Sequence, residues 1–345
     1  MRKPLSFIHI GLPKCGSTFL QNIYSNAPNT ATFALDVLND WVAKTVSEGG
    51  QPPTLPRVSL PAELVAAQQQ GKTLFASTER LSVPFLHQAD IEQALPAHRS
   101  LIARTLAHQE LSDHIWLMVR DPIAWIRSMH TQSIKQGAFD DAQTFLARHW
   151  PTLQHGLDLE GHLEVWTSAI PHLLLTPLET LQDDEEATLK SVEAFCGAPA
   201  PPAALRARLA QMSLVRNRSF KQRLPYLAAF NRQTALMKQA VESLPHNQPD
   251  LSPFVQSSLK LGLAQQNFQR FVAETIKDAD FTAIVEDLQV PDAEAFAAFR
   301  LDQEQADWIA QRFLRPLTEQ QRVPAALASS YADSLHQATH HPSHA

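Results

Sequence analysis

The chain has 345 residues, of which 44% are hydrophobic and 19% charged, and its formal net charge is −6 at pH 7. This balance is that of a globular protein long enough to bury a sizeable core. The negative charge argues against a protein that coats nucleic acid or anionic membrane, because both partners need a broad cationic surface. We therefore expect any anionic ligand to be held by a local site.

The two cysteines, Cys15 and Cys196, are too few for a disulfide scaffold or a cysteine-based zinc site. The apolar run at residues 7–10 is shorter than the hydrophobic region of a secretory signal, and no segment approaches the ~20 apolar residues of a membrane span. We expect reduced thiols, no membrane span and a cytoplasmic protein.

The first predicted strand, residues 7–10, leads directly into Gly11-Leu12-Pro13-Lys14-Cys15-Gly16-Ser17-Thr18-Phe19, and residues 18–24 have helical character. A strand, a glycine loop and a helix in this order are typical of an anion-binding loop, because the helix start turns N–H groups and partial positive charge toward one anion. The two glycines permit positive φ, the two hydroxyls can donate hydrogen bonds, and Lys14 adds a mobile cation.

The spacing of Gly11 and Gly16 matches the nucleoside-triphosphate loop G-x-x-x-x-G-K-[ST], but Ser17 stands where that loop has its lysine. Without this lysine the β- and γ-phosphates of ATP lose their usual partner. The loop therefore fits a 5′-phosphosulfate better than a triphosphate.

The middle of the chain predicts an α/β fold. Residues 30–61 are rich in proline and glycine and are predicted to form a loop. Short apolar runs predict further strands buried on both faces, and helical spacing predicts helices between them. The strands are expected at residues 73–76, 115–119 and 173–175, and the helices at residues 61–70, 96–109 and 159–169. This alternation indicates a central parallel sheet flanked by helices.

A second motif follows the strand at residues 115–119. Asp121 is a favourable N-cap and Pro122 a favourable first helical residue, so a helix is predicted to start here. Ser128 lies two helical turns after the cap, on the face that leans back toward it. We expect Arg120 and Ser128 to converge on one anion at the carboxyl end of the strand, where α/β sheets bind ligands.

The C-terminal part is predicted to be helical. We expect an α/β core over residues 1–220 and a helical extension packed on it over residues 221–335. Predicted helices cover residues 203–212, 224–244, 253–279 and 293–313. Residues 336–345 include His336, His340, His341 and His344; metal binding is one interpretation, and we expect a disordered polar tail with no metal site.

Residues 13–19 resemble the 5′-phosphosulfate loop of sulfotransferases that use PAPS (3′-phosphoadenosine 5′-phosphosulfate), and the chain as a whole resembles bacterial and carbohydrate-type members of that family. The spacing of Arg120 and Ser128 resembles the 3′-phosphate motif of the same family. The resemblance implies a P-loop-like fold, PAPS as donor and no metal. It also implies that Lys14 contacts the sulfuryl and 5′-phosphate oxygens and that Phe19 stacks on adenine.

The resemblance also implies a catalytic glutamate after the second predicted strand of the core, which is Glu79 here. His130 and His9 are the alternative bases. The late basic segment that contains Arg216, Arg218 and Ser219 stands where the family closes a loop over the 3′-phosphate. The Arg-Lys-Gly form of that loop is absent.

Two other classes of function remain open at this stage: a P-loop kinase or other nucleoside-triphosphate enzyme with Asp121 as a magnesium ligand, and a non-catalytic nucleotide-binding protein. If the chain transfers sulfuryl groups, its acceptor is a hydroxyl or amine on a saccharide, a lipid headgroup or a small metabolite. The sequence does not choose among these acceptors and does not indicate an oligomeric state.

Overall fold

The computed structural model describes residues 3–33, 35, 60–79, 82, 95–209, 224–225, 227–229, 231–232, 235, 292–319 and 322–340. The chain divides into two compact units. One contains Met1–Ile126, His149–Ala210 and Arg300–His341, and the other contains Arg127–Arg148, Gln211–Phe299 and Pro342–Ala345. The first unit holds the entire sheet, and the segment 300–340 belongs to that unit.

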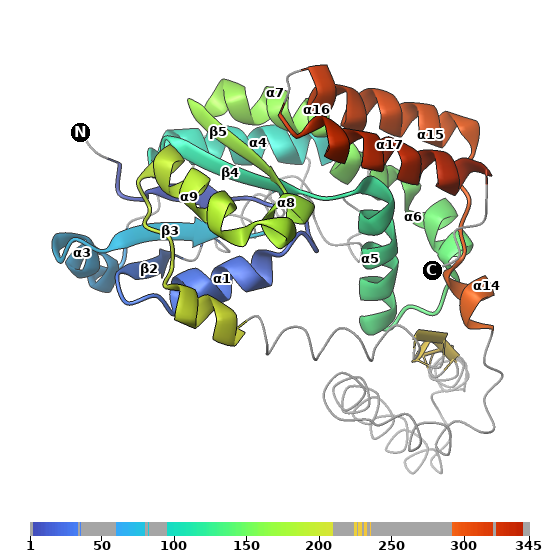
Figure 1. The fold of residues 1–345 in the computed structure, drawn as a ribbon, viewed down its shortest axis with the longest axis horizontal. Helices are drawn as coiled ribbons and strands as arrows, with labels where there is room; N and C mark the ends of the chain where they lie inside the picture. The colour runs from blue at the N-terminus through green and yellow to red at the C-terminus, as the bar shows by residue number, and fades with distance from the viewer. Residues whose placement is uncertain are drawn as a thin grey trace, which may run out of the picture. The chain divides into compact units, whose positions relative to one another are not determined.

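Five parallel strands form the sheet, in the order β2-β3-β1-β4-β5 (Figure 1). They are β1 (Phe7–His9), β2 (Thr30–Phe33), β3 (Thr73–Ser77), β4 (His114–Val119) and β5 (His172–Pro177). The central strand β1 pairs with both β3 and β4, and Ile8 lies opposite Ala76 on one side and Ile115 on the other. The four predicted strands are confirmed. Because the strands are parallel, the segments that follow β1, β3 and β4 leave the same edge of the sheet.

The strand β2 corrects the prediction for residues 30–61. Its four residues, Thr-Ala-Thr-Phe, were assigned to a loop, but they pair with β3 along its full length. Thr30 and Phe33 are buried at its two ends, while Ala31 and Thr32 are more exposed. A run this short, at the edge of the sheet and half exposed, carries too weak an alternation to stand out from its neighbours.

Aromatic side chains fill the centre of the sheet. Phe7 stacks on Phe75 with ring centroids 5.4 Å apart, and it meets Trp116 edge to face at 5.8 Å. All three side chains are buried. Burying an aromatic side chain of this size stabilises the fold by about 1.5–3 kcal/mol, so the apolar runs that predicted the strands also stabilise the sheet that carries the loop at residues 11–16.

Helices cover both faces of the sheet (Figure 1). The helices α1 (Ser17–Ser25), α8 (Leu178–Asp183) and α9 (Glu185–Cys196) lie on one face, and α4 (Leu95–Gln109) and α7 (Leu159–Ala169) lie on the other. The helix α3 (Ala62–Gln69) packs beside β2 and β3. The residues of α5 (Pro122–Lys135) and α6 (Ala142–Leu157) divide between the two units. The predicted helices at 18–24, 61–70, 96–109 and 159–169 are confirmed.

The C-terminal helices differ from the prediction for residues 293–313. That segment forms α14 (Ala293–Ala297), an extended stretch, α15 (Gln303–Ile309) and the π-helix η4 (Ala310–Leu314). The break arises because Asp302 starts a new helix with a capping box that includes Gln305. Two further helices, α16 (Arg315–Glu319) and α17 (Ala325–His340), complete this part. The first five residues of the predicted disordered tail are therefore helical.

Of the remaining predicted helices, residues 203–209 are helical. Residues 253–279, and most of residues 224–244, lie outside the described residues. None of the described helices has the length and apolar character needed to cross a membrane.

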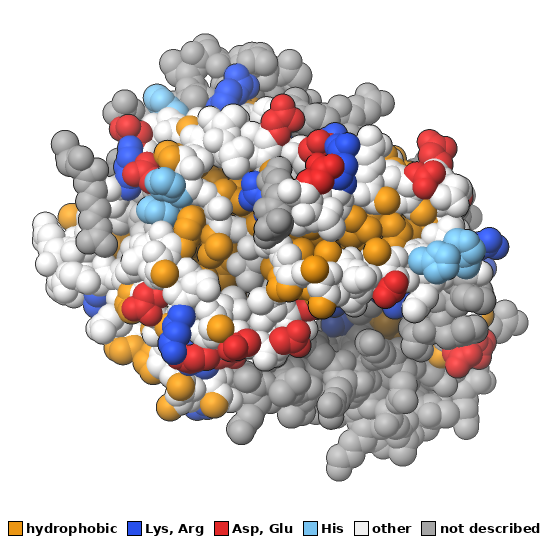
Figure 2. All heavy atoms as spheres, turned by 45° about the horizontal axis from the view of Figure 1, so that its top comes forward, with side chains coloured by type: hydrophobic (Ala, Val, Ile, Leu, Met, Phe, Trp, Pro, Cys, Tyr) orange, Lys and Arg blue, Asp and Glu red, His pale blue; other side chains and the backbone are white. Residues whose placement is uncertain are grey.

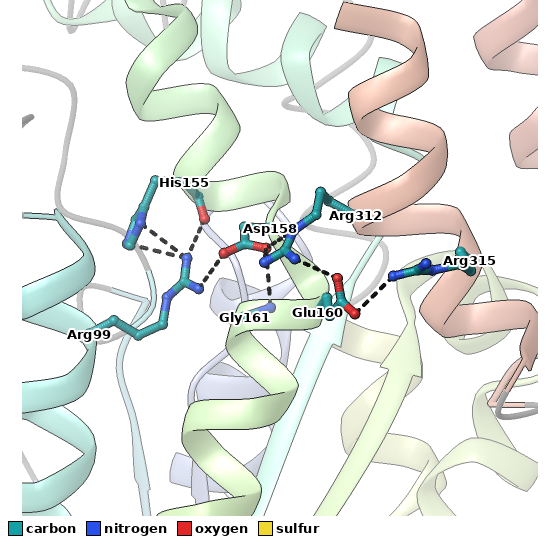
Figure 3. A network of polar contacts seen from close by, with 7 residues as sticks. All are labelled: Arg99, His155, Asp158, Glu160, Gly161, Arg312 and Arg315. Atoms are coloured by element: carbon teal, nitrogen blue, oxygen red, sulfur yellow. Dashed lines mark hydrogen bonds and ion pairs between the residues drawn. The ribbon is translucent and has the colours of Figure 1, made fainter.

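An ionic network joins α4, the junction of α6 and α7, and the C-terminal helices within the first unit (Figure 3). The nearly buried Arg99 donates to Asp158 Oδ2 at 2.9 Å, and Arg312 donates from Nε to Asp158 Oδ1 at 2.8 Å. Glu160 accepts hydrogen bonds from Arg312 and Arg315. Asp158 also caps α7 through the Gly161 N–H. The network anchors η4 and α16 to the helices on one face of the sheet.

Candidate functional site

Three backbone carbonyls of the candidate anion-binding loop, residues 11–16, are held by side chains from other parts of the first unit. The hydrogen bonds run from Ser82 Oγ to Gly11 O (2.9 Å), from Trp125 Nε1 to Pro13 O (2.8 Å) and from Arg120 Nη1 to Lys14 O (3.2 Å). The strand pairing also continues into the loop, because the Leu12 N–H donates to Met118 O at 3.0 Å. These hydrogen bonds thus hold the carbonyl groups of the loop in place.

The backbone turns sharply at Lys14 and Gly16, whose φ angles are 66° and 87°. Gly16 is the N-cap of α1, and no side chain caps this helix. The first N–H groups of an α-helix have no partner within the helix, so the start of α1 offers donors to an anion. Both loop glycines permit positive φ, and the structure has it at Gly16 and at Lys14 but not at Gly11.

Gly11 meets a different requirement. A Cβ at this position would lie 2.7 Å from His9 Nε2, so only glycine fits against the histidine ring. His9 is buried and its Nδ1 is hydrogen bonded to Ser77 Oγ at 2.8 Å. Burial lowers the pKa of His9 to about 3, which keeps the ring neutral at physiological pH. His9 therefore packs against Gly11 at the start of the loop as a neutral ring.

Cys15 lies inside the loop, and its side chain is fully buried. Burial raises the pKa of its thiol well above the ordinary value; Arg120 and Lys14 act against this shift, and Glu179 and Glu79 add to it. These four charged groups therefore lie close to Cys15. The Cys15 N–H donates to Leu12 O at 3.2 Å and its thiol donates to Pro13 O at 3.8 Å, so both groups are directed at carbonyls of the loop itself.

Glu79 follows β3 and lies beside the loop. Burial raises the pKa of its carboxyl, while the Ser17 hydroxyl, the Lys14 charge and the Lys14 backbone N–H lower it. The structure therefore brings Glu79 together with Lys14 and Ser17, at the edge of the sheet where β1 and β3 end. The single Ser82 hydroxyl proton is shared between the Glu79 carbonyl, at 2.8 Å, and the Gly11 carbonyl, at 2.9 Å, which links this segment to the loop.

Arg120 and Asp121 follow β4 as predicted for the start of a helix. Asp121 caps α5, because its Oδ1 accepts the Ala124 N–H at 2.7 Å. Arg120 donates to the Lys14 carbonyl, yet its buried Nε has no hydrogen-bond partner in the described part of the chain. The guanidinium therefore retains an unused donor close to the loop.

Two residues of α17 reach this region, and no sequence pattern pointed to them. Ser334 donates to Asp121 Oδ1 at 3.2 Å, and Tyr331 donates its hydroxyl to Glu179 Oε2. Glu179 in turn accepts the Asp121 N–H at 3.1 Å. Burial raises the pKa of Asp121, and the nearby Glu179 raises it further. The C-terminal helix thus holds the carboxylates that flank the start of α5.

The remaining predicted site residues are placed as follows. Thr18 is exposed and Phe19 partly exposed on α1. Ser128 lies in α5, within the second unit. His130 also lies in the second unit; it donates from Nε2 to Asp140 O at 2.8 Å, and burial lowers its pKa. Arg216, Arg218 and Ser219 lie outside the described residues.

Charge on the described surface is mixed. On the face shown in Figure 2, basic side chains lie singly or beside acidic ones, and the described residues there form no broad basic patch. No group of three or more His, Cys, Asp or Glu side chains within the described ranges is arranged to hold a metal ion.

No protein-family model matches this sequence, and no curated protein matches it. Among solved structures, a sulfotransferase from Alicyclobacillus acidocaldarius is similar to this chain with a TM-score of 0.35 and 14% sequence identity. The similarity covers 65% of this chain and 95% of the other.

Proposed function

We propose that this chain is a sulfotransferase that moves a sulfuryl group from PAPS to a hydroxyl or amine. The observation that carries the proposal is the gathering of Lys14, Glu79 and Arg120 around the buried Cys15. These residues follow three neighbouring parallel strands, so they share one edge of the sheet. A cation, a carboxylate and a second cation at one helix start suit transfer between an anionic donor and a protic acceptor.

Different residues bind the two ends of the donor nucleotide. The open start of α1 and the Lys14 ammonium bind the 5′-phosphosulfate, and the Phe19 ring stacks on adenine. Arg120 binds the 3′-phosphate. The hydrogen bond from Arg120 to the Lys14 carbonyl supports this assignment, because it places the guanidinium beside the loop.

PAPS supplies a sulfuryl group attached to a phosphate leaving group. The residues of this chain orient the donor and the acceptor and neutralise the negative charge on the donor. Lys14 stabilises the charge that develops on the sulfuryl and bridging oxygens. Glu79 removes the proton of the acceptor hydroxyl, which typically contributes about 10²–10⁴-fold in rate. The raised pKa of Glu79 supports this role, because a base closer to neutrality transfers protons more effectively.

The acceptor is a saccharide, a lipid headgroup or a small metabolite. A nucleoside-triphosphate enzyme is less well supported. Ser17 occupies the position of the phosphate-binding lysine, and the carboxylate of Asp121 is engaged by the Ala124 N–H and by Ser334.

Thermal unfolding with a panel of nucleotides tests the proposal. We expect 3′,5′-bisphosphoadenosine, the product left after transfer, to raise the Tm without added metal, and we expect ATP with magnesium to leave it unchanged. Stabilisation by ATP with magnesium alone would show that the chain is a nucleoside-triphosphate enzyme. If the bisphosphate binds but mass spectrometry detects no sulfated product with PAPS and a panel of hydroxyl and amine acceptors, the chain is a non-catalytic nucleotide-binding protein.

A further inference from the structure

Trp125 is a buried residue in the second turn of α5, and its indole N–H donates to the Pro13 carbonyl at 2.8 Å. The next carbonyl along the loop, that of Lys14, accepts from Arg120 at 3.2 Å. Arg120, just after β4, and Trp125, in α5, therefore hold two successive carbonyls of the loop. Neither the charge pattern nor the spacing of the sequence singled out Trp125.

The opposite side of the Trp125 ring lies against α6. A Cβ at Gly156 would lie 2.5 Å from Trp125 Cη2 and 2.9 Å from Cζ2, so glycine is required where α6 approaches the indole. The junction of α6 and α7 just beyond is held by the network of Arg99, Asp158 and Arg312. The indole is thus confined between a fixed helix and the loop carbonyl.

We propose that Trp125 is a positioning residue for the donor, which acts by holding the Pro13 carbonyl so that Lys14 and the start of α1 keep their geometry. The inference rests on the proposed function, because the ligand concerned is the donor nucleotide. Pro13 is buried and its neighbour Lys14 has positive φ, so a carbonyl released at Pro13 loses its partner and frees the turn that aims Lys14.

The test is Trp125→Phe, which keeps an aromatic ring and removes the indole N–H. Trp116→Phe is a matched control, because Trp116 is equally buried and donates from Nε1 to Thr176 Oγ1 at 2.9 Å, away from the loop carbonyls. Calorimetry with 3′,5′-bisphosphoadenosine gives the Kd of each protein, and thermal unfolding gives the Tm. We expect Trp125→Phe to weaken binding by about 10-fold and Trp116→Phe by less than about 2-fold, with both lowering the Tm.

Turnover separates positioning from a general loss of structure. With saturating PAPS the bound donor orders the loop, so Trp125→Phe should raise the KM for PAPS while changing kcat by less than about 3-fold. Equal Kd values for Trp125→Phe and Trp116→Phe, or a Kd for Trp125→Phe equal to that of wild type, would overturn the inference. Wild-type protein that does not bind the bisphosphate would overturn the proposed function, and the inference with it.

If Trp125→Phe does not fold, Gly156→Ala serves as the second variant. It keeps the indole N–H and pushes the ring away from α6 toward the loop. We expect the same weakening of the bisphosphate, and a wild-type Kd in this variant would contradict the role of Trp125.

Discussion

Lys14 combines a charge next to Glu79 with a left-handed backbone, φ 66°. A residue other than glycine pays about 1 kcal/mol in this conformation, and such strain is often found at functional sites. Lysine at position 14 therefore lowers stability but places a cation inside the loop.

We expect Lys14→Ala and Lys14→Gly to lower kcat alike, by about 100-fold or more, because both remove the cation from the charge that develops on the sulfuryl oxygens. The glycine variant should be more stable than the alanine variant by about 1 kcal/mol, since glycine relieves the strain at φ 66°. Steady-state kinetics and urea unfolding measure the two effects. A wild-type kcat in either variant would contradict the role of Lys14.

The pH dependence of activity and stability reports on Glu79. Because burial raises its pKa, the acidic limb of the kcat/KM profile should lie above the pH of an ordinary carboxyl, and Glu79→Gln should abolish turnover. A raised pKa means that folding favours the protonated form, so the contribution of Glu79 to stability is lost as pH rises through that pKa.

The free energy of unfolding of Glu79→Gln relative to wild type should therefore increase with pH. Urea unfolding of both proteins between about pH 4 and pH 8 measures it. A difference that falls with pH would show that Glu79 is stabilised as a carboxylate in the fold.

At the scale of elements, the turn into α1 depends on Gly16. Its φ is 87°, and a Cβ there would lie 2.9 Å from Leu178 Cδ1. Gly71 is a matched control, because its φ is 77° and a Cβ there would meet nothing within 4 Å. Alanine at either position should reduce stability by about 1 kcal/mol through backbone strain. Only Gly16→Ala should also weaken binding of 3′,5′-bisphosphoadenosine, which calorimetry measures; equal binding in both variants would contradict the assignment of the loop.

The elements that the sequence predicted are those with a strong local signal. The apolar runs that became β1, β3, β4 and β5, and the cap at Asp121, are visible in a few consecutive residues. The edge strand β2 is too short for this, and the break before α15 depends on a cap within a helical pattern. The positive φ at Lys14 was missed because positive φ is expected at glycine. In the structure the hydrogen bond from Arg120 to the Lys14 carbonyl, a contact between distant residues, helps to hold Lys14 in this conformation.

At the scale of the molecule, the segment 300–340 is part of the unit that contains the sheet. Tyr331 contacts Glu179, 152 residues earlier in the chain, and Ser334 contacts Asp121, 213 residues earlier. Contacts at such separations leave no pattern in a single sequence. For this reason the sequence predicted helices in this region but not their contribution to the candidate site.

The ionic network gives this attachment a measurable energy (Figure 3). Arg312 bonds both Asp158 and Glu160, and its side chain is 33% exposed, whereas Arg315 bonds only Glu160 in the network and is 42% exposed. Replacing Arg312 by methionine should lower the free energy of unfolding by about 1–3 kcal/mol, and the same change at Arg315 by less than about 1 kcal/mol. Urea unfolding measures both, and equal losses would show that the double contact of Arg312 adds no stability.

In the proposed donor site, Arg120 binds the 3′-phosphate and Lys14 binds the 5′ end of one doubly phosphorylated adenosine carrier. Calorimetry of wild type and Arg120→Ala with 3′,5′-bisphosphoadenosine and with AMP tests it most directly, because the two ligands differ only in the 3′-phosphate. We predict that wild type prefers the bisphosphate by at least about 10-fold and that Arg120→Ala has no preference. A preference of the same size in both proteins would contradict the account.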